Sequence, residues 1–515
     1  RDWSSDVCSS DLLHTKRNKM ENRNLKQDLA QLDAILKDQG ISRRDAMKMM
    51  GLSGAAFMVG GTEAEAASEL KASGAKGHVL IIGGGLAGMS TAARLRSSAS
   101  DVQITVIEPE AASCSYQPGQ TLVGAGLWDK SEILYKRDDF VPSDVKIIKE
   151  KAVKFDAKNN TVTTDKGTEV KYDMMVIAAG VKLNYAAIKG LEGAGEAYSS
   201  GDNRALVSEL NAKGVSSIYS ADGSEATWAN MQKFIAAAKS GKKVKGVFTH
   251  PNTPIKCGGA PKKIMYLTNA RLKEAGARDN ADLHFYPNGG GMFGIKDYHT
   301  AIVKQFEREG FNWSYKHNLV EVNNGTAIFD NHGKAKGAWD EDLEEYATIT
   351  THKKVETNFD FLHVTPPMKA PDELGKSEVG SAKGWIPVNK ETMQHVKFPN
   401  VFALGDIAAV PMGKTGGSAR KQYKVVVNNV ISMLESGSIP ATNAKYAGYT
   451  VCPLITSIGT VMLAEFNWAS KKLGSGTNAA MTTLLDPTQE RYIWWLLKFY
   501  LLKPMTVYGM LAGKA

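Results

Sequence analysis

Continuous hydrophobic runs separated by mixed segments dominate the pattern of this chain. Residues 78–82 form the first run, a helical pattern continues to Arg96, and 102–107 form a second run. Short apolar runs of this kind predict strands buried on both faces, as in a parallel sheet. Similar runs at 172–180 and 401–406 end in small residues. Strands alternating with helices predict an α/β fold.

A glycine motif separates the first strand from its helix. Gly83, Gly84, Gly85 and Gly88 form a G-x-G-x-x-G pattern, and Glu108 ends the second strand twenty residues after Gly88. Such a turn lets backbone amides approach a pyrophosphate at a helix N-terminus, and the acid accepts from ribose hydroxyls. The pattern predicts dinucleotide binding, although a purely structural glycine turn and the choice between FAD and NAD stay open.

The sequence predicts a second nucleotide-type domain that lacks the glycine motif expected after its first strand. The strand at 243–250 leads into a loop at 251–261 with prolines and Cys257, before a helix at 262–273. A helix N-terminus favours thiolate, so Cys257 is a candidate reactive thiol, with a structural cysteine as the alternative. A later glycine motif at 289–294 is followed at the acidic position by Ser314, which argues against nicotinamide binding there.

Composition narrows the class of protein. The 515 residues are 43% hydrophobic and 23% charged, which indicates two or three globular domains and excludes a disordered chain. The net charge of +9 comes without a basic run interleaved with aromatics, so nucleic acid is not expected. The four cysteines show no spacing typical of zinc, so we expect no metal.

The N-terminal residues resemble a targeting signal rather than a folded domain. Residues 1–19 look derived from an adaptor or vector, and 20–66 contain Arg43 and Arg44, a mild apolar stretch and an A-x-A site at 64–66. Paired arginines in this context resemble a twin-arginine export signal. We therefore expect a protein on the periplasmic face of the cytoplasmic membrane, with a surface helix carrying two chance arginines as the alternative.

The C-terminal region has an aromatic run at 491–504. Its apolar core of about eleven residues is too short to span a bilayer. Aromatics flanked by lysines are typical of a helix lying in the membrane interface, which predicts a peripheral protein. A helix of the protein core is the other interpretation.

Several segments together resemble the sulfide:quinone oxidoreductase family, and its mitochondrial subtype most. They are PNTPIKCGGAPKKIMYLTNA (251–270), LHVTPPM (362–368), GWIPVNKETMQH (384–395), VFALGD (401–406) and GYTVCPLITSIGTVMLAEF (448–466). The resemblance implies two Rossmann-like domains of the glutathione-reductase type and a membrane-associating C-terminal region. The implied FAD-binding domain is discontinuous and consists of 77–190 and 380–435. The second Rossmann-like domain spans 191–375, and the C-terminal region spans 436–515.

The resemblance also implies roles for individual residues. Cys257 and Cys452 match the redox-active pair, which would form a disulfide or persulfide while sulfide is oxidised to sulfane sulfur or polysulfide. Gln422 and Lys498 match positions on the quinone side. The implied FAD contacts are Gly83, Gly84, Gly85, Gly88, Glu108, Gln117, Ala152, Asp406, Lys414, Gly416, Gly417, Ser418 and Ala419.

The implied partners are hydrogen sulfide, a sulfur acceptor, membrane quinone and a lipid surface, while a homo-oligomer is left open. Cys114 is an additional thiol near the FAD loop, and we expect the FAD to be non-covalent. Residues 197–240 look longer than in the family. The alternatives are a flavocytochrome c-type sulfide dehydrogenase subunit, an NADH:quinone oxidoreductase-like enzyme and a non-catalytic flavoprotein scaffold.

Overall fold

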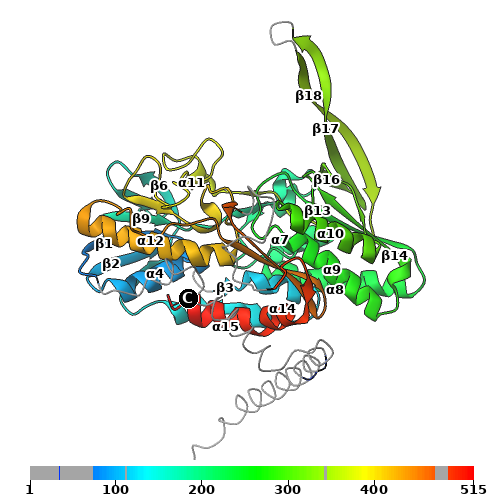
Figure 1. Ribbon diagram of the computed structural model, residues 1–515, viewed down its shortest axis with the longest axis horizontal. Coiled ribbons are helices and arrows are strands. Elements are labelled where there is room, and N and C mark those ends of the chain that lie inside the picture. The colour runs from blue at the N-terminus through cyan, green and yellow to red at the C-terminus, as the bar shows by residue number, and fades with distance from the viewer. Residues whose placement is uncertain are drawn as a thin grey trace, which may run out of the picture.

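Two parallel sheets organise the computed structural model, which describes residues 73–110, 113–340, 345–469 and 485–514 together with Ala30 and Ala34 (Figure 1). The expected export signal lies outside the described residues. Each sheet has helices packed on it and its own hydrophobic core. This arrangement is the α/β architecture that the alternating runs predict.

The first sheet has five parallel strands in the order β21-β9-β1-β2-β5. The buried runs of the sequence supply its centre, since Val79, Leu80 and Ile81 of β1 are fully buried. The strands are β1 (Gly77–Ile82), β2 (Val102–Ile107), β5 (Val145–Ile148), β9 (Met174–Ile177) and β21 (Val401–Ala403), with helices α4 (Leu86–Ser98) and α12 (Gly416–Ser436) packed on each other.

Smaller elements complete this first domain. An antiparallel sheet contains β6 (Ala152–Asp156), β7 (Thr161–Thr164) and β8 (Glu169–Lys171), and a two-stranded pair contains β3 (Ser113–Ser115) and β4 (Leu134–Lys136). The short helices are α5 (Gln120–Val123), α6 (Lys130–Ile133) and α11 (Asp372–Gly375). A further sheet, whose Leu183 and Met368 pack in the second core, joins β10 (Lys182–Asn184), β11 (Glu196–Ala197) and β20 (Met368–Lys369).

The second sheet is also parallel, in the order β12-β19-β13-β14-β15. It contains β12 (Val215–Ser216), β13 (Val244–His250), β14 (Ala281–Pro287), β15 (Asn312–Trp313) and β19 (Phe361–His363), and its helices are α7 (Arg204–Ala212), α8 (Ala221–Lys239), α9 (Ala260–Glu274) and α10 (Lys296–Glu309). The segment 197–240 is thus integral to this domain, because it supplies β12 and α8.

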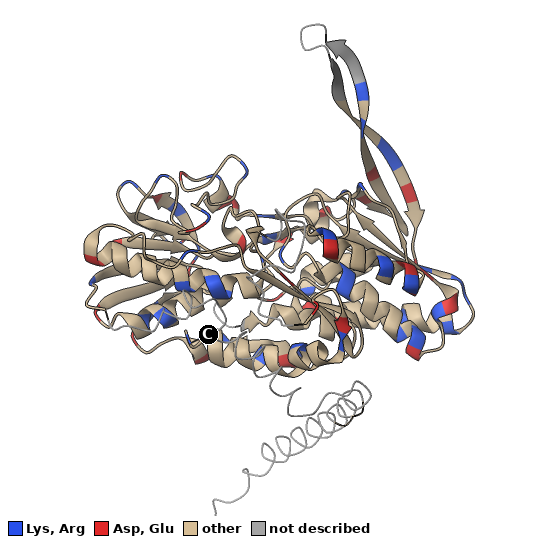
Figure 2. Cartoon of the chain, viewed as in Figure 1, with Lys and Arg blue, Asp and Glu red and all other residues tan. Residues whose placement is uncertain are grey.

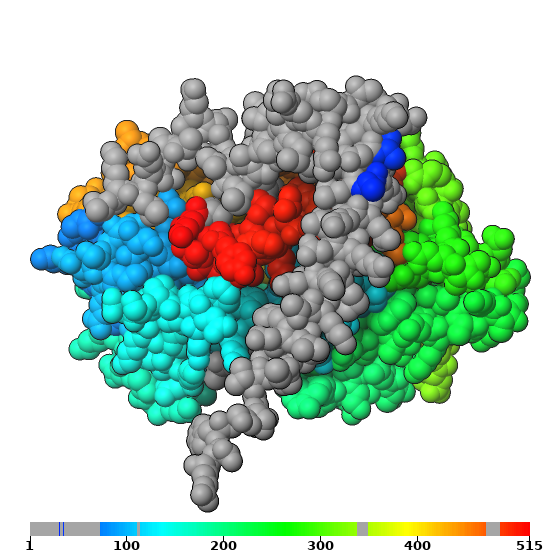
Figure 3. All heavy atoms as spheres, turned by 90° about the horizontal axis from the view of Figure 1, so that it is seen from below, coloured from blue at the N-terminus to red at the C-terminus, as the bar shows by residue number. Residues whose placement is uncertain are grey.

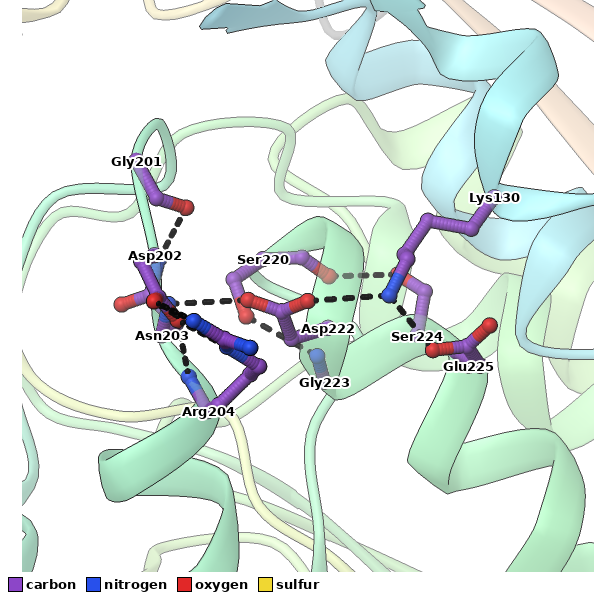
Figure 4. Close-up of polar contacts among 10 residues, drawn as sticks. All are labelled: Lys130, Gly201, Asp202, Asn203, Arg204, Ser220, Asp222, Gly223, Ser224 and Glu225. Carbon is purple, nitrogen blue, oxygen red and sulfur yellow. Dashed lines mark hydrogen bonds and ion pairs between the residues drawn. The ribbon is translucent and has the colours of Figure 1, made fainter.

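A polar cluster fastens that segment to the first domain (Figure 4). Lys130 on α6 reaches Asp222 at 3.1 Å and Glu225 at 2.6 Å, both on α8. Asp222 also accepts from the backbone N–H of Asn203 at 2.8 Å, which holds the start of α7 beside α8. Asp222 therefore links α6 of the first domain with α7 and α8 of the second.

A long hairpin extends from the second domain (Figure 1). It is built from β17 (Thr326–Asp340) and β18 (Glu345–Asn358), and β16 (His317–Asn323) pairs only with the part of β17 up to Asn331. The hairpin is called the arm from here on. It points away from the face that carries α14 and α15.

The C-terminal region packs against both cores. It contains β22 (Thr450–Ser457), β23 (Thr460–Phe466) and β24 (Glu490–Arg491), then α14 (Tyr492–Leu496), η7 (Leu497–Leu501), α15 (Leu502–Pro504) and η8 (Met505–Met510). Trp494 and Trp495 are buried, while Leu501 is 42% and Tyr508 75% exposed. The inner side of this helical segment is therefore core, while Leu501 and Tyr508 expose apolar area on its outer side. Part of the segment is visible at the surface (Figure 3).

None of the helices that the structure describes has both the length and the apolarity needed to cross a membrane. Basic and acidic residues are interspersed along the ribbon of both domains (Figure 2). No three metal-ligating side chains among the described residues lie close enough to hold an ion.

Candidate active site

The first glycine turn is shaped by close packing. Gly83 has a φ of +103°, and a Cβ there would lie 2.6 Å from the carbonyl oxygen of Ala178. A Cβ on Gly88 would lie 1.9 Å from the oxygen of Gly83. A Cβ on Gly85 would meet nothing within 4 Å, so the middle of the turn faces open space at the N-terminus of α4. This is the geometry of an anion cradle.

Glu108 lies beside the turn, as its spacing predicts. Its carboxylate accepts from the N–H of Gly84 at 2.6 Å. Arg137, which is almost fully buried, donates to the oxygen of Gly84 at 2.8 Å and lies 3.8 Å from Glu108. No sequence pattern marks Arg137, because this contact arises only when a distant 3-10 turn folds onto the glycine turn.

A second helix N-terminus converges on the same place. Thr415 caps α12 by accepting from the N–H of Ser418, and a Cβ on Gly416 would lie 3.8 Å from the side chain of Leu86 in α4. Lys414 donates to the backbone carbonyl oxygen of Asp406 at 2.5 Å. Burial raises the pKa of Asp406 and lowers the pKa of Lys414 to about 8. The predicted loop at 414–419 therefore adjoins the glycine turn.

These features fit a flavin dinucleotide. The open space at Gly85 suits a pyrophosphate, and the two helix N-termini supply donors to it. Gln422 accepts from the N–H of Gly405 at 2.8 Å, and its side-chain amide also interacts with the hydroxyl of Tyr446. These contacts fix Gln422 directly behind the loop that carries Asp406.

Cys257 and Cys452 are brought together from distant elements. Cys257 lies between β13 and α9, and Cys452 lies on β22 opposite Ala464 of β23. Their side chains are in hydrogen-bond contact as free thiols. A Cβ on Gly259 would lie 2.4 Å from the sulfur of Cys452. The absence of a side chain at Gly259 is therefore what admits the second thiol.

The backbone also positions Cys257. Its φ of 50° is in the left-handed region, which costs energy for a residue with a Cβ and is frequent at functional sites. The N–H of Cys257 donates to the carbonyl oxygen of Lys414 at 2.9 Å. This hydrogen bond ties the thiol loop of the second domain to the dinucleotide loop of the first.

Four buried lysines surround the thiols, and only Lys498 among them was predicted from the sequence as a site residue. Lys263 lies 3.4 Å from the sulfur of Cys257 and contacts both thiols. Lys256, Lys262 and Lys498 lie within electrostatic range. Lys263 lies near the start of α9. The helix predicted directly after Cys257 could therefore have indicated that this lysine lies close to the thiol.

The electrostatics favour one thiolate. The hydrogen bond from Cys452, joined by Lys263, holds the pKa of Cys257 well below its usual range despite burial. The contact with Cys257 and burial raise the pKa of Cys452. Burial lowers the pKa of Lys498 to about 7 and that of Lys262 to about 8. The negative charge of the pair therefore resides on Cys257.

Two other predicted residues line the same region. Gln117 accepts from Lys256 at 2.8 Å, which places it beside the thiol loop. Lys498 donates to the oxygen of Pro118 at 2.6 Å and lies 5.8 Å from the ring centre of Tyr116. The C-terminal helical segment thus reaches the thiols through Lys498.

The remaining predicted positions lie further out. Ala152 begins β6 in the antiparallel sheet and packs partly buried against the first core. The sulfur of Cys114 lies 3.9 Å from the oxygen of Gly84, and burial raises the pKa of Cys114. The glycine loop at 289–294 follows β14, where the N–H of Met292 donates to His299 at 3.0 Å.

Comparison with known proteins points to one family. The family model for pyridine nucleotide-disulphide oxidoreductases matches residues 77–218. The chain is 34% identical over 429 residues to the mitochondrial sulfide:quinone oxidoreductase of Mus musculus, covering 82% of this chain and 84% of that protein. It is 32% identical to the corresponding protein of Dictyostelium discoideum, covering 85% and 86%.

A solved structure shares the fold. The sulfide:quinone oxidoreductase of Aquifex aeolicus superposes with a TM-score of 0.64 at 19% identity, covering 85% of this chain and 92% of that one. The likeness extends over both Rossmann-like domains.

Proposed function

The chain belongs to the sulfide:quinone oxidoreductase family, and from this premise we propose how its own residues carry out the reaction. The protein is an FAD-dependent oxidoreductase that oxidises sulfide and passes the electrons to quinone. The observation that carries the residue assignment is the contact between Cys257 and Cys452, next to the two convergent helix N-termini.

In the proposed cycle the two thiols alternate with a disulfide. The sulfur of hydrosulfide attacks Cys452 of the disulfide, the S–S bond breaks, Cys452 becomes a persulfide and Cys257 leaves as thiolate. Thiol–disulfide exchange favours the leaving group with the lower pKa, and here that is Cys257. Lys263, at 3.4 Å, stabilises the charge that appears on its sulfur.

A nucleophilic acceptor then takes the outer sulfur of the persulfide and leaves Cys452 as a thiol. Re-forming the disulfide removes two electrons, and accepting such a pair before quinone takes it is the chemistry that bound FAD supplies. The residues that would hold FAD are the glycine turn at 83–88, Glu108, Asp406 and the loop at 414–419. Each sulfide oxidised therefore delivers two electrons and one sulfane sulfur.

Non-covalent attachment of FAD is part of the proposal. Cys114 contacts the carbonyl of Gly84, and burial keeps its thiol protonated. A protonated thiol is a weak nucleophile. Denaturation in acid should release all the flavin from the protein; yellow colour that stays with the precipitated chain would contradict this assignment.

We further propose that the outer face of the helical segment 492–510 rests on a lipid surface, close to where quinone is reduced. Leu501 and Tyr508 expose apolar area on that face, while Lys498 on the inner side reaches the thiol site. Because Trp494 is core, truncation would unfold the protein, so L501E/Y508E is the sharper variant. It should abolish sedimentation with liposomes while sulfide still reduces the flavin.

For the location, we propose export by the twin-arginine route, on the basis of Arg43, Arg44 and the site at 64–66. In a bacterial host that has this pathway, R43K/R44K should retain the protein in the cytoplasm. Unchanged periplasmic accumulation would refute the proposal.

The central test is a flavin bleaching experiment. Sulfide should bleach the holoenzyme, and added quinone should restore the colour, whereas NAD⁺ and cytochrome c should not. Bleaching that persists at the wild-type rate after removal of Cys257 would reject the thiol assignment. Recolouring by cytochrome c alone would favour a flavocytochrome c-type partner.

A further inference from the structure

Lys262 is a buried cation without a carboxylate partner. The residue is 2% exposed, and the part of the chain that the structure describes places no carboxylate within ion-pair distance of its Nζ. Among those residues Nζ donates a single hydrogen bond, a long one of 3.3 Å to the carbonyl oxygen of Gly258. An ammonium group has three donors, so burying it with so little compensation costs free energy.

The position of Lys262 on α9 adds to this cost. It is the third residue of the helix, whose first turn contains no acidic side chain. A positive charge is unfavourable at a helix N-terminus, because that end of the dipole is itself positive. The ring of Phe285, with its centre 5.2 Å from Nζ, offsets only part of the loss. A lysine kept in such a place indicates that the reaction produces an anion nearby.

The loop beneath Lys262 identifies the atom that becomes negative. Gly258, which accepts from Nζ, is followed by Gly259, and a Cβ on Gly259 would lie 2.4 Å from the sulfur of Cys452. Lys262 interacts electrostatically with Cys452 and, less strongly, with Cys257. The buried ammonium group therefore lies on the side of the thiol pair where Cys452 enters.

Cys452 needs a cation of its own in one step of the proposed cycle. Lys263, at 3.4 Å from Cys257, stabilises the thiolate that sulfide attack creates on that residue. Transfer of the outer sulfur then puts a second negative charge on Cys452. Lys263 contacts both thiols, but a single ammonium group balances only one thiolate. Contact with Cys257 and burial raise the pKa of Cys452, which makes it a poor leaving group without help.

We propose that Lys262 stabilises the thiolate of Cys452 when a nucleophilic acceptor removes the persulfide sulfur, an assignment that rests on the proposed function. In this step a bond forms between the acceptor and the outer sulfur, the S–S bond breaks, and its electron pair stays on the sulfur of Cys452. The proton of the outer sulfur passes to solvent, and no electron reaches the flavin yet. Lys263 thus serves sulfide attack, and Lys262 serves sulfur transfer.

The lifetime of the persulfide in K262M tests this assignment. The holoenzyme receives one equivalent of sulfide and then sulfite as a nucleophilic probe. Rapid quenching with an alkylating agent, followed by mass spectrometry, measures the persulfide on Cys452. Persulfide formation should stay within about twofold of wild type, whereas its decay with sulfite should slow roughly tenfold. K262R, which keeps the charge, should recover most of the decay rate, and K304M, which changes an exposed lysine of α10, should match wild type.

Thermal stability separates this role from a structural one. Since Lys262 is buried without a carboxylate, the apolar side chain of K262M should raise the melting temperature rather than lower it. A lower melting temperature, a persulfide that decays as fast in K262M as in wild type, or a slow decay that K262R does not improve would each overturn the assignment. If wild type forms no persulfide on Cys452 at all, the proposed cycle itself is wrong.

Discussion

The two Rossmann-like domains place different chemistry at the same point of the fold. In the first, β1 leads through three glycines into α4, and backbone amides face open space at Gly85. In the second, β13 leads through a longer loop with Cys257 into α9, which carries Lys262 and Lys263. Both sites lie at the carboxyl end of a parallel strand, where such sheets bind ligands.

The difference shows how an anion site becomes a redox site. In the first domain, backbone dipoles at a helix N-terminus suit a negatively charged ligand. The second stabilises negative charge on its own sulfur with an ammonium group at 3.4 Å. Gly85, whose missing side chain leaves open space in one domain, has its counterpart in Gly259, which admits the sulfur of Cys452 in the other.

Removing either sulfur should have the largest effect. C257S or C452S leaves no disulfide for sulfide to attack, so the rate of flavin bleaching by sulfide should fall roughly a thousandfold or more. Stopped-flow absorbance measures this rate. Reduction of the flavin by dithionite should be unaffected, which separates a chemical defect from a loss of cofactor.

Crowding the two cysteines should have the second-largest effect. In G259A the new Cβ would lie 2.4 Å from the sulfur of Cys452, so one thiol must move and bleaching should slow by about a hundredfold. G258A is the matched control, because a Cβ at Gly258 meets nothing within 4 Å. Equal rates for the two variants would contradict the packing argument.

Replacing Lys263 with a neutral residue should shift the pH dependence of kcat/KM. K263M removes a cation that helps to lower the pKa of Cys257, so this pKa should rise and less thiolate should exist at pH 7. The rising limb of the kcat/KM profile should move to higher pH, with a loss of roughly tenfold at neutral pH. K304M on α10, an exposed lysine, serves as control, and a profile unmoved by K263M would exclude this role.

Filling the glycine turn should have the smallest effect. G85A fits the folded chain because its Cβ has open space, but the methyl group would occupy room for the pyrophosphate. FAD affinity should fall by about 1–2 kcal/mol while the melting temperature of the apoprotein is retained. G290A, in the glycine loop of the second domain, also has open space and should leave FAD affinity unchanged.

The sequence indicated those parts of the site that depend on local pattern. The run at 78–82, the glycine spacing and Glu108 follow directly from how a strand, a turn and a helix connect. The contact between Cys257 and Cys452 was implied only by family resemblance, since local pattern says nothing about residues 195 apart in the chain. Lys256 and Arg137 were missed because burial of a charge depends on which distant segments fold over it.

The arm and the C-terminal segment show the same limit. No strands were predicted over 326–340 or 345–358, and that β16 pairs with β17 only as far as Asn331 is a property of the fold. Residues 491–504 allowed both an interfacial helix and a core helix. The structure buries Trp494 and exposes Leu501, because a helix has two sides and the hydrophobic run covers both.

The hydrogen bond from Cys257 to the carbonyl of Lys414 has a mechanical consequence. It crosses from one domain to the other next to the thiol pair, so a hinge motion that parted the domains would break it and move Cys257 away from Cys452. The position of Cys257 is therefore coupled to how the two domains are packed.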